Sequence, residues 1–92
     1  MIIDVEKIRN NEFKVNVKSE IETIHFVNIR ETWYLEKTDG KLCKKRLIEL
    51  SFRFLLDREP NTSILEKFDL DLISHYFPEY INDIKDWCLR LS

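Results

Sequence analysis

Glycine, proline and cysteine are scarce in this chain of 92 residues, which holds one Gly, two Pro and two Cys. Because Gly40 is the only glycine, the chain cannot contain the phosphate-binding loops GxxxxGK or GxGxxG, and nucleotide binding by such loops is excluded. So little Gly and Pro also leaves no flexible linker, and no internal repeat or low-complexity tract is present. We therefore predict a single domain over residues 1–92.

The few cysteines and histidines do not form a metal-binding pattern. Cys43, Cys88, His25 and His75 share neither the CxxC nor the HxxxH spacing that zinc sites use. We therefore expect no metal and no other cofactor. We expect both cysteines to be free thiols that pack as small apolar side chains.

Long hydrophobic runs are also missing. No apolar stretch approaches the roughly 18 residues that a membrane-spanning helix requires. The chain shows no apolar leader with a small-residue cleavage site. We therefore expect a cytoplasmic protein with no membrane partner.

Neither sign of charge dominates the chain. Its 15 Lys and Arg against 17 Asp and Glu give a formal net charge of -2, so no overall field attracts nucleic acid. The one basic cluster lies at the start of a predicted helix, where backbone amides also favour an anion, and consists of Lys41, Lys44, Lys45 and Arg46. We take these four residues as candidates for contact with an anion or a nucleic acid, with a solvated basic helix start as the alternative.

Apolar and aromatic residues are plentiful: 43% of the chain is hydrophobic, and it has six Phe, three Tyr and two Trp. This composition is typical of a folded domain with a core. Alternation of apolar and polar residues predicts strands over residues 2–8, 13–18 and 22–29. Three consecutive strands joined by short polar turns predict an antiparallel meander.

Helical spacing of apolar residues follows the strands. We predict helices over residues 31–37, 42–58, 69–76 and 78–91. Gly40 suits the left-handed residue after the first helix, and Asp69 is expected to cap the third. Ile64, Leu65 and Phe68 are expected to be apolar plugs in a compact loop. The predicted fold class is α+β, with an N-terminal three-stranded antiparallel meander packed against three to four α-helices.

A catalytic centre would have to use one of the two imidazoles, His25 or His75, or a carboxylate of shifted pKa. Neither histidine has a neighbour in the sequence that suggests a catalytic pair. Ser51 lies within an apolar helical segment and lacks a nucleophile elbow, so we expect it to permit close packing. We predict no catalytic residue and no enzyme, and a small enzyme using His25 or His75 stays an open alternative.

The order of elements suggests a second alternative. Residues 22–29, followed by two helical segments, resemble the order of a ribbon-helix-helix repressor, in which a two-stranded ribbon of a dimer enters the major groove. Neither face of this strand is rich in the side chains that read base edges. A ribbon-helix-helix-like, nucleic-acid-binding regulator therefore stays an alternative.

Residues 51–80 carry a pattern that resembles a known family. It consists of SFRFLLDREP at residues 51–60, SIL at 63–65, FDL at 68–70 and YFPEY at 76–80. In this pattern, SFxFLLxREPxxSIL with FDL and YFPEY, the chain is similar to a family of short, uncharacterised bacterial proteins, and residues 23–35 are similar more loosely. That family has no assigned activity, so the resemblance implies a self-contained bacterial domain and assigns no site residue.

The aromatic residues Trp33, Tyr34 and Trp87 are expected to exceed what one small core buries and to form a partner surface. We therefore predict a non-catalytic protein-interaction or regulatory module, which binds a protein partner or associates with itself as a homodimer. That both tryptophans simply belong to the core is the open alternative.

Overall fold

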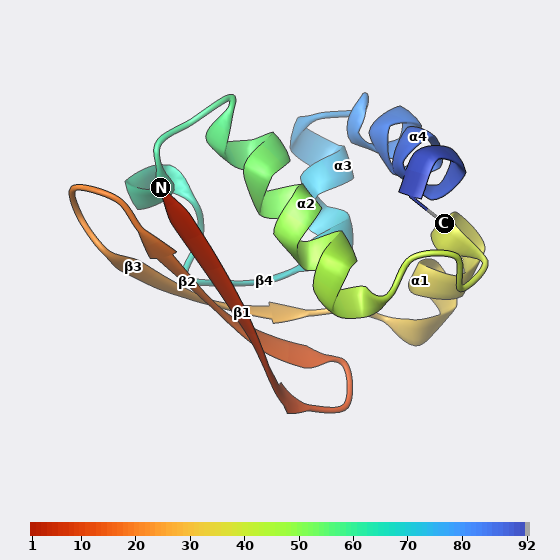
Figure 1. The fold of residues 1–92 in the computed structure, drawn as a ribbon, viewed down its shortest axis with the longest axis horizontal. Helices are drawn as coiled ribbons and strands as arrows, with labels where there is room; N and C mark the ends of the chain where they lie inside the picture. Colours follow the sequence, from red (N-terminus) through yellow and green to blue (C-terminus); the bar gives the residue numbers. More distant parts are fainter. Residues whose placement is uncertain (92) are drawn as a thin grey trace.

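The computed structural model describes residues 1–91 and shows a four-stranded sheet whose helices lie on one side of it (Figure 1). The strands are β1 (Ile2–Arg9), β2 (Glu12–Lys18), β3 (Thr23–Asn28) and β4 (Lys67–Asp69). The helices are α1 (Glu31–Thr38), α2 (Lys44–Leu56), α3 (Ile73–Tyr76) and α4 (Tyr80–Leu91). Two 3-10 turns, Asn61–Ser63 and Leu70–Leu72, connect them. The α+β class is confirmed. Within residues 1–91 no helix has the length and apolar character needed to cross a bilayer.

β1, β2 and β3 form the antiparallel meander that the alternating pattern predicted. Asn11, in the first turn, has a φ of 66°, a left-handed conformation that asparagine tolerates better than most residues. β4 adds a fourth strand, because it pairs in parallel with β3 and places Phe68 beside Val27. The prediction of a meander alone is therefore corrected: the sheet is mixed, and Phe68, expected in a loop, belongs to a strand.

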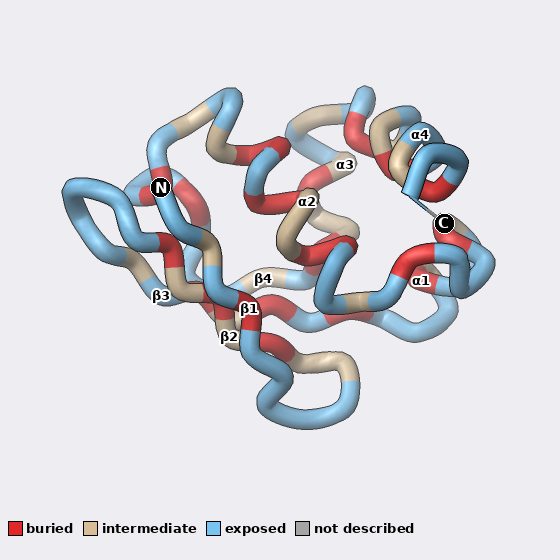
Figure 2. Tube along the Cα trace, viewed as in Figure 1, coloured by how far each residue is buried: buried red, intermediate tan, exposed pale blue. Residues whose placement is uncertain are grey.

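Cross-strand pairing places a row of side chains on the face toward the helices. Val5, Val15 and His25 are paired across β1, β2 and β3, and all three are buried. Figure 2 shows the alternation of buried and exposed positions along these strands. Intervening residues such as Lys14 belong to the opposite face, which is not covered by any helix of residues 1–91 (Figure 1).

α2 lies against the buried face and contacts β1. Its buried side chains follow helical spacing and are Leu47, Ile48, Ser51, Phe52, Phe54 and Leu55. Phe52 is fully buried and packs on the ring of His25, with 5.4 Å between the ring centroids. α2 is thus the helix predicted over residues 42–58, although it is shorter at both ends.

The predicted helix over residues 69–76 is divided in the structure. Its first residue ends β4, a 3-10 turn follows, and only the last four residues form α3. Asp69 does not cap a helix, because its carboxylate accepts a hydrogen bond from the Asn28 side-chain amide at 3.2 Å. α4 begins at Tyr80, two residues after Pro78.

Candidate functional site

The buried side chain of His25 joins β3 to the segment before β4. Its Nδ1 lies 2.7 Å from the carbonyl oxygen of Leu65, and since a carbonyl only accepts, Nδ1 carries the hydrogen. Its Nε2 lies 2.9 Å from the Thr23 hydroxyl. In the neutral ring Nε2 then accepts from that hydroxyl, which itself accepts from the Asn61 side-chain amide at 2.9 Å. Both ring nitrogens are therefore engaged in hydrogen bonds within the fold, and His25, which is 2% exposed, lines neither of the two hollows described below.

His75 is exposed and lines a polar hollow of about 450 Å³, together with Arg30, Trp33, Asp69, Asp71, Leu72 and Ser74. The charged groups are largely engaged with one another, since Arg30 forms an ion pair with Asp71. The Ser74 hydroxyl donates to the carbonyl oxygen of Asp71 at 2.7 Å. Within residues 1–91 no hydrogen bond joins Ser74 to His75, so the hollow lacks a nucleophile and base pair.

The basic cluster at the start of α2 is partly neutralised inside the molecule. Lys44 forms an ion pair with Glu31, and Arg46 forms one with Glu49. The other two lysines of the cluster are exposed. The cluster therefore offers less free positive charge than its sequence suggests.

The strand that would form an intermolecular ribbon is β3. It pairs with β2 on one side and with β4 on the other. β2 occupies one edge along β3, and β4 occupies the other edge over Phe26, Val27 and Asn28. Only the first half of β3 is left on that side for pairing with a second copy in the manner of a ribbon-helix-helix dimer.

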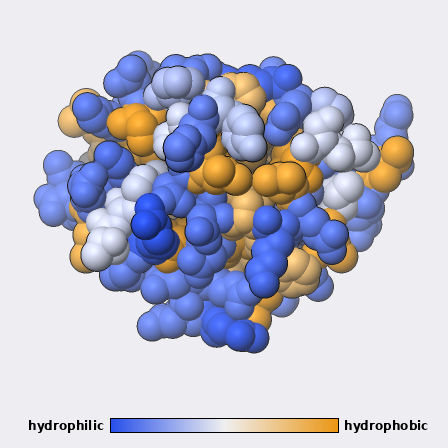
Figure 3. Space-filling view, turned by 180° about the vertical axis from the view of Figure 1, so that it is seen from behind, coloured by the Kyte–Doolittle hydropathy of each residue, from blue (hydrophilic) through white to orange (hydrophobic). Residues whose placement is uncertain are grey.

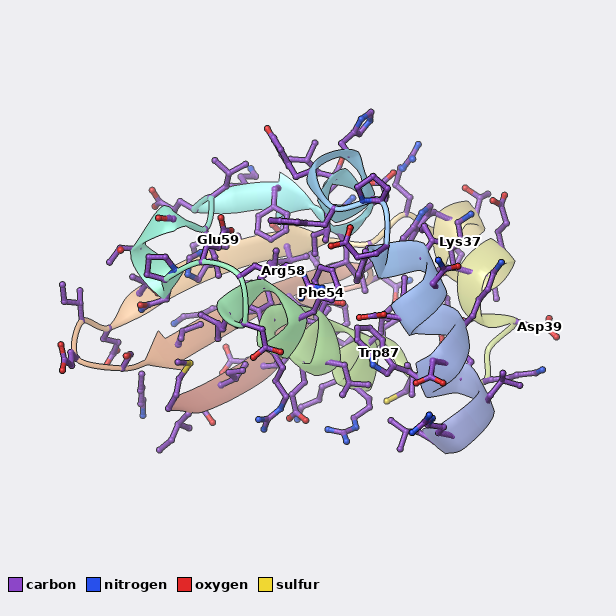
Figure 4. The ribbon with its side chains drawn as sticks, turned by 90° about the horizontal axis from the view of Figure 1, so that it is seen from above. Lys37, Asp39, Phe54, Arg58, Glu59 and Trp87 are labelled. Carbon is purple, nitrogen blue, oxygen red and sulfur yellow. The ribbon has the colours of Figure 1, made fainter. Side chains whose placement is uncertain are left out.

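The three aromatic residues expected to form a partner surface pack into the molecule. Tyr34 is buried, and its hydroxyl donates to the carbonyl oxygen of Leu42 at 2.6 Å. Trp33 and Trp87 are half-buried against Tyr80, at 6.4 and 6.1 Å between ring centroids. Figure 4 shows Trp87 on the side of α4 that faces α2. The expected exposure is wrong for Tyr34, because the segment after α1 folds back over it.

Tyr80 lies at the centre of this aromatic cluster and is fully buried. The Ser51 hydroxyl donates to the Leu47 carbonyl oxygen at 2.6 Å, so the Tyr80 hydroxyl donates to Ser51 Oγ at 2.6 Å. Burial raises the pKa of the Tyr80 hydroxyl far above its ordinary value, and the hydroxyl stays a donor at neutral pH. Ser51 thus has a packing and hydrogen-bonding role in the core.

An apolar groove of about 300 Å³ lies where β4 and α3 meet the end of α2. It is lined by Leu55, Glu59, Ser63, Ile64, Leu65, Phe68, Leu72, Ile73, Tyr76 and Phe77. All of these except Glu59 and Ser63 are apolar or aromatic. Figure 3 shows hydrophobic side chains gathered across the middle of the face that lies behind Figure 1, where β4 and α3 run. Residues 51–80, which carry the resemblance to short bacterial proteins, supply the whole lining.

The groove has a buried floor and an exposed rim. Ile64 and Ile73 in the floor are buried. Leu65, from the segment before β4, is 51% exposed, and Tyr76, at the end of α3, is 68% exposed. The two rim residues come from different elements, and His25 fixes one of them through the Leu65 carbonyl.

Arg58 and Glu59, two of the three charged residues that follow α2, lie in different surroundings. The guanidinium of Arg58 lies 3.5 Å from the ring centroid of Phe54, and it donates to the Phe54 carbonyl and to Glu79. Figure 4 shows Arg58 and Phe54 together between α2 and α4, with Glu59 apart from them toward β4. Glu59 lines the groove and has no ion pair with any residue of 1–91.

No protein-family model, curated protein or solved structure matches the chain. Its function is therefore inferred from its own residues, and within residues 1–91 the groove is the strongest candidate site. The sequence interpretation missed the groove because its lining comes from five separate elements and the segments between them. One signal was present: eight of the fourteen residues 64–77 are apolar or aromatic, more than the short helix predicted there buries on one face.

The two cysteines differ in exposure, and no group of three His, Cys, Asp or Glu side chains within residues 1–91 is placed to hold a metal ion. Burial raises the pKa of the Cys88 thiol and outweighs the opposing effect of Lys41. We expect a thiol reagent at neutral pH to modify exposed Cys43 at least about tenfold faster than Cys88, which reacts only when the fold opens. Mass spectrometry of quenched samples would measure both rates. A Cys43→Ser variant that still reacted rapidly would show that Cys88 is accessible.

Proposed function

We propose that the protein is a non-catalytic interaction module of the bacterial cytoplasm, and that its groove binds an apolar segment of a partner protein. The observation that supports this most strongly is a buried floor combined with an exposed apolar rim at Leu65 and Tyr76. Covering such a rim removes apolar surface from water, which favours a complex by about 25 cal/mol for each Å². Tyrosine is also among the residues that dominate the binding energy of protein interfaces.

The size and lining of the groove favour a peptide over a small molecule. Its volume of about 300 Å³ is at the lower end of the range of roughly 300–1,000 Å³ that holds drug-sized ligands. Its polar side-chain groups are limited to the carboxylate of Glu59 and the hydroxyls of Ser63 and Tyr76. A peptide suits this surface, because its apolar side chains enter the recess while its backbone stays hydrated at the rim.

Leu65→Asp is expected to weaken the binding of apolar peptides at least about tenfold. The aspartate would place a hydrated charge at the edge of the recess, where a bound peptide would have to cover it. Short random peptides displayed on phage would be selected on the wild-type protein, and fluorescence anisotropy would give the affinity of each selected peptide for both proteins.

Leu89→Asp is the matched control, because Leu89 is 79% exposed on α4 and does not line the groove. Its affinity for the same peptides is expected to equal that of the wild type. Equal weakening by the two substitutions, or failure to select any peptide, would overturn the proposed function. A concentration-dependent dimer that Leu65→Asp dissociates would show that a second copy of the chain fills the groove, and would overturn the choice of a different partner protein.

A further inference from the structure

Glu59 is a carboxylate at the edge of an apolar recess. It is half-buried and shares the groove lining with Leu55 and Ile64. Most other carboxylates of residues 1–91 are either paired with a cation or exposed to water. Among the described residues only Glu59 combines partial burial, the absence of an ion pair and a position in the groove.

The cation nearest in sequence does not neutralise Glu59. The guanidinium of Arg58 lies over the rings of Phe54 and Phe77. It donates to the Phe54 carbonyl and to the carboxylate of Glu79, and no ion pair joins it to Glu59. Within residues 1–91 no lysine or arginine lines the groove. Within residues 1–91 the carboxylate of Glu59 thus has no ion pair, so a bound segment can supply the positive charge.

The segment around the groove is acidic as well. Residues 57–79 carry six acidic and two basic side chains, although the whole chain is close to neutral. Such a local excess attracts cationic molecules and raises their rate of association. The acidic segment and the carboxylate of Glu59 thus both favour a positively charged partner.

We infer that Glu59 selects a partner segment that carries a lysine or arginine next to its apolar anchor. This inference rests on the proposed function of the groove. A peptide that covers the groove removes water from Glu59, and a carboxylate that loses water without gaining a partner opposes binding. A guanidinium or ammonium group on the peptide replaces the lost water, whereas an acidic side chain there repels the carboxylate. Glu59 is thus a specificity-determining residue that discriminates against neutral and acidic segments.

The test uses synthetic peptides that have been selected on the wild-type protein and that contain a basic residue. Each is compared with a second peptide in which that basic residue is replaced by glutamate. The wild type is expected to bind the basic peptide at least about tenfold more tightly than the acidic one. Glu59→Lys is expected to reverse this preference, and Glu59→Gln is expected to reduce it to less than about threefold. Raising the salt concentration is expected to weaken the binding of the basic peptide to the wild type and so to reduce the preference.

Glu66→Lys is the matched control, because Glu66 is exposed close to β4 and does not line the groove. It makes the same change in net charge and is expected to keep the wild-type preference. Unchanged preference in Glu59→Lys and Glu59→Gln, while Leu65→Asp still weakens every peptide, would overturn the charge inference alone. No effect of Leu65→Asp on any peptide would overturn the proposed function and the charge inference with it. Thermal unfolding of each variant would show whether it is folded. If Glu59→Lys does not fold, the binding preference of the isosteric Glu59→Gln tests the charge inference.

Discussion

Replacing Tyr80 with alanine is expected to lower the free energy of unfolding by about 3–5 kcal/mol. Tyr80 is fully buried and contacts rings from three helices, Trp33 of α1, Phe54 of α2 and Trp87 of α4. Alanine would leave a cavity at the point where these helices meet. Since a domain of this size has a total stability of about 5–15 kcal/mol, the loss is large enough to leave part of the population unfolded. Urea unfolding followed by tryptophan fluorescence measures it.

Two companion variants separate the causes of this loss. Tyr80→Phe keeps the ring and removes only the hydrogen bond to Ser51, so it is expected to cost about 1 kcal/mol. Tyr76→Ala removes the same type of side chain from an exposed position and is expected to change stability by no more than about 0.5 kcal/mol. The two tyrosines thus differ in position: Tyr80 lies in the core, and Tyr76 lies at the exposed rim of the groove. Equal destabilisation by Tyr76→Ala and Tyr80→Ala would show that the rim of the groove is part of the core.

Replacing His25 with alanine is expected to lower the free energy of unfolding by about 2–4 kcal/mol. The substitution removes a buried ring that packs on Phe52 and leaves the Leu65 carbonyl and the Thr23 hydroxyl without their partner. It also releases the segment that carries one side of the groove. Hydrogen exchange at the amide of Phe26, which donates to the Glu66 carbonyl, should therefore become faster than the global loss of stability requires.

His75→Ala is the control for this prediction, since His75 is exposed and lies outside the groove lining. It is expected to change stability by less than about 0.5 kcal/mol and to leave the exchange of the Phe26 amide unchanged. If His25→Ala proved as mild as His75→Ala, the hydrogen bonds of His25 would not be what fixes the segment before β4.

The sequence predicted the elements whose residues follow one simple period. Phe13, Val15 and Val17 alternate as a strand should, and all three are buried in β2. Leu47 and Ser51 repeat at helical spacing, and both face the core from α2. These patterns are local, because burial of one face is enough to impose them.

β4 could not be predicted in the same way. It has only three residues, too few for alternation to be recognised, and its pairing with β3 depends on a contact between residues about forty positions apart, such as Val27 and Phe68. The same long-range contact gives two of the residues expected as apolar loop plugs other positions. Phe68 became part of the sheet, and Leu65 became an exposed rim residue.

Only the apolar composition of the candidate site could be predicted from the sequence. Residues 64–77 hold more apolar side chains than the short helix expected there buries, which indicates an apolar surface but not its shape. The number of aromatic residues instead predicted a partner surface that includes Tyr34. Tyr34 is buried by the segment after α1, and the sequence does not specify the path of that segment. The sequence alone gives Glu59 no role, because its lack of a partner depends on which groups hold Arg58.

Titration of the isotope-labelled protein with a peptide selected on it, followed by amide chemical shifts, tests the binding groove most directly. We predict that the largest shifts belong to groove residues such as Ile64, Phe68, Ile73 and Phe77, and that they saturate together. We predict no comparable shifts on the helix-free face of the sheet, around Lys14. Shifts confined to that face or to α4, with the groove residues unmoved, would show that the groove is not where the protein binds its partner.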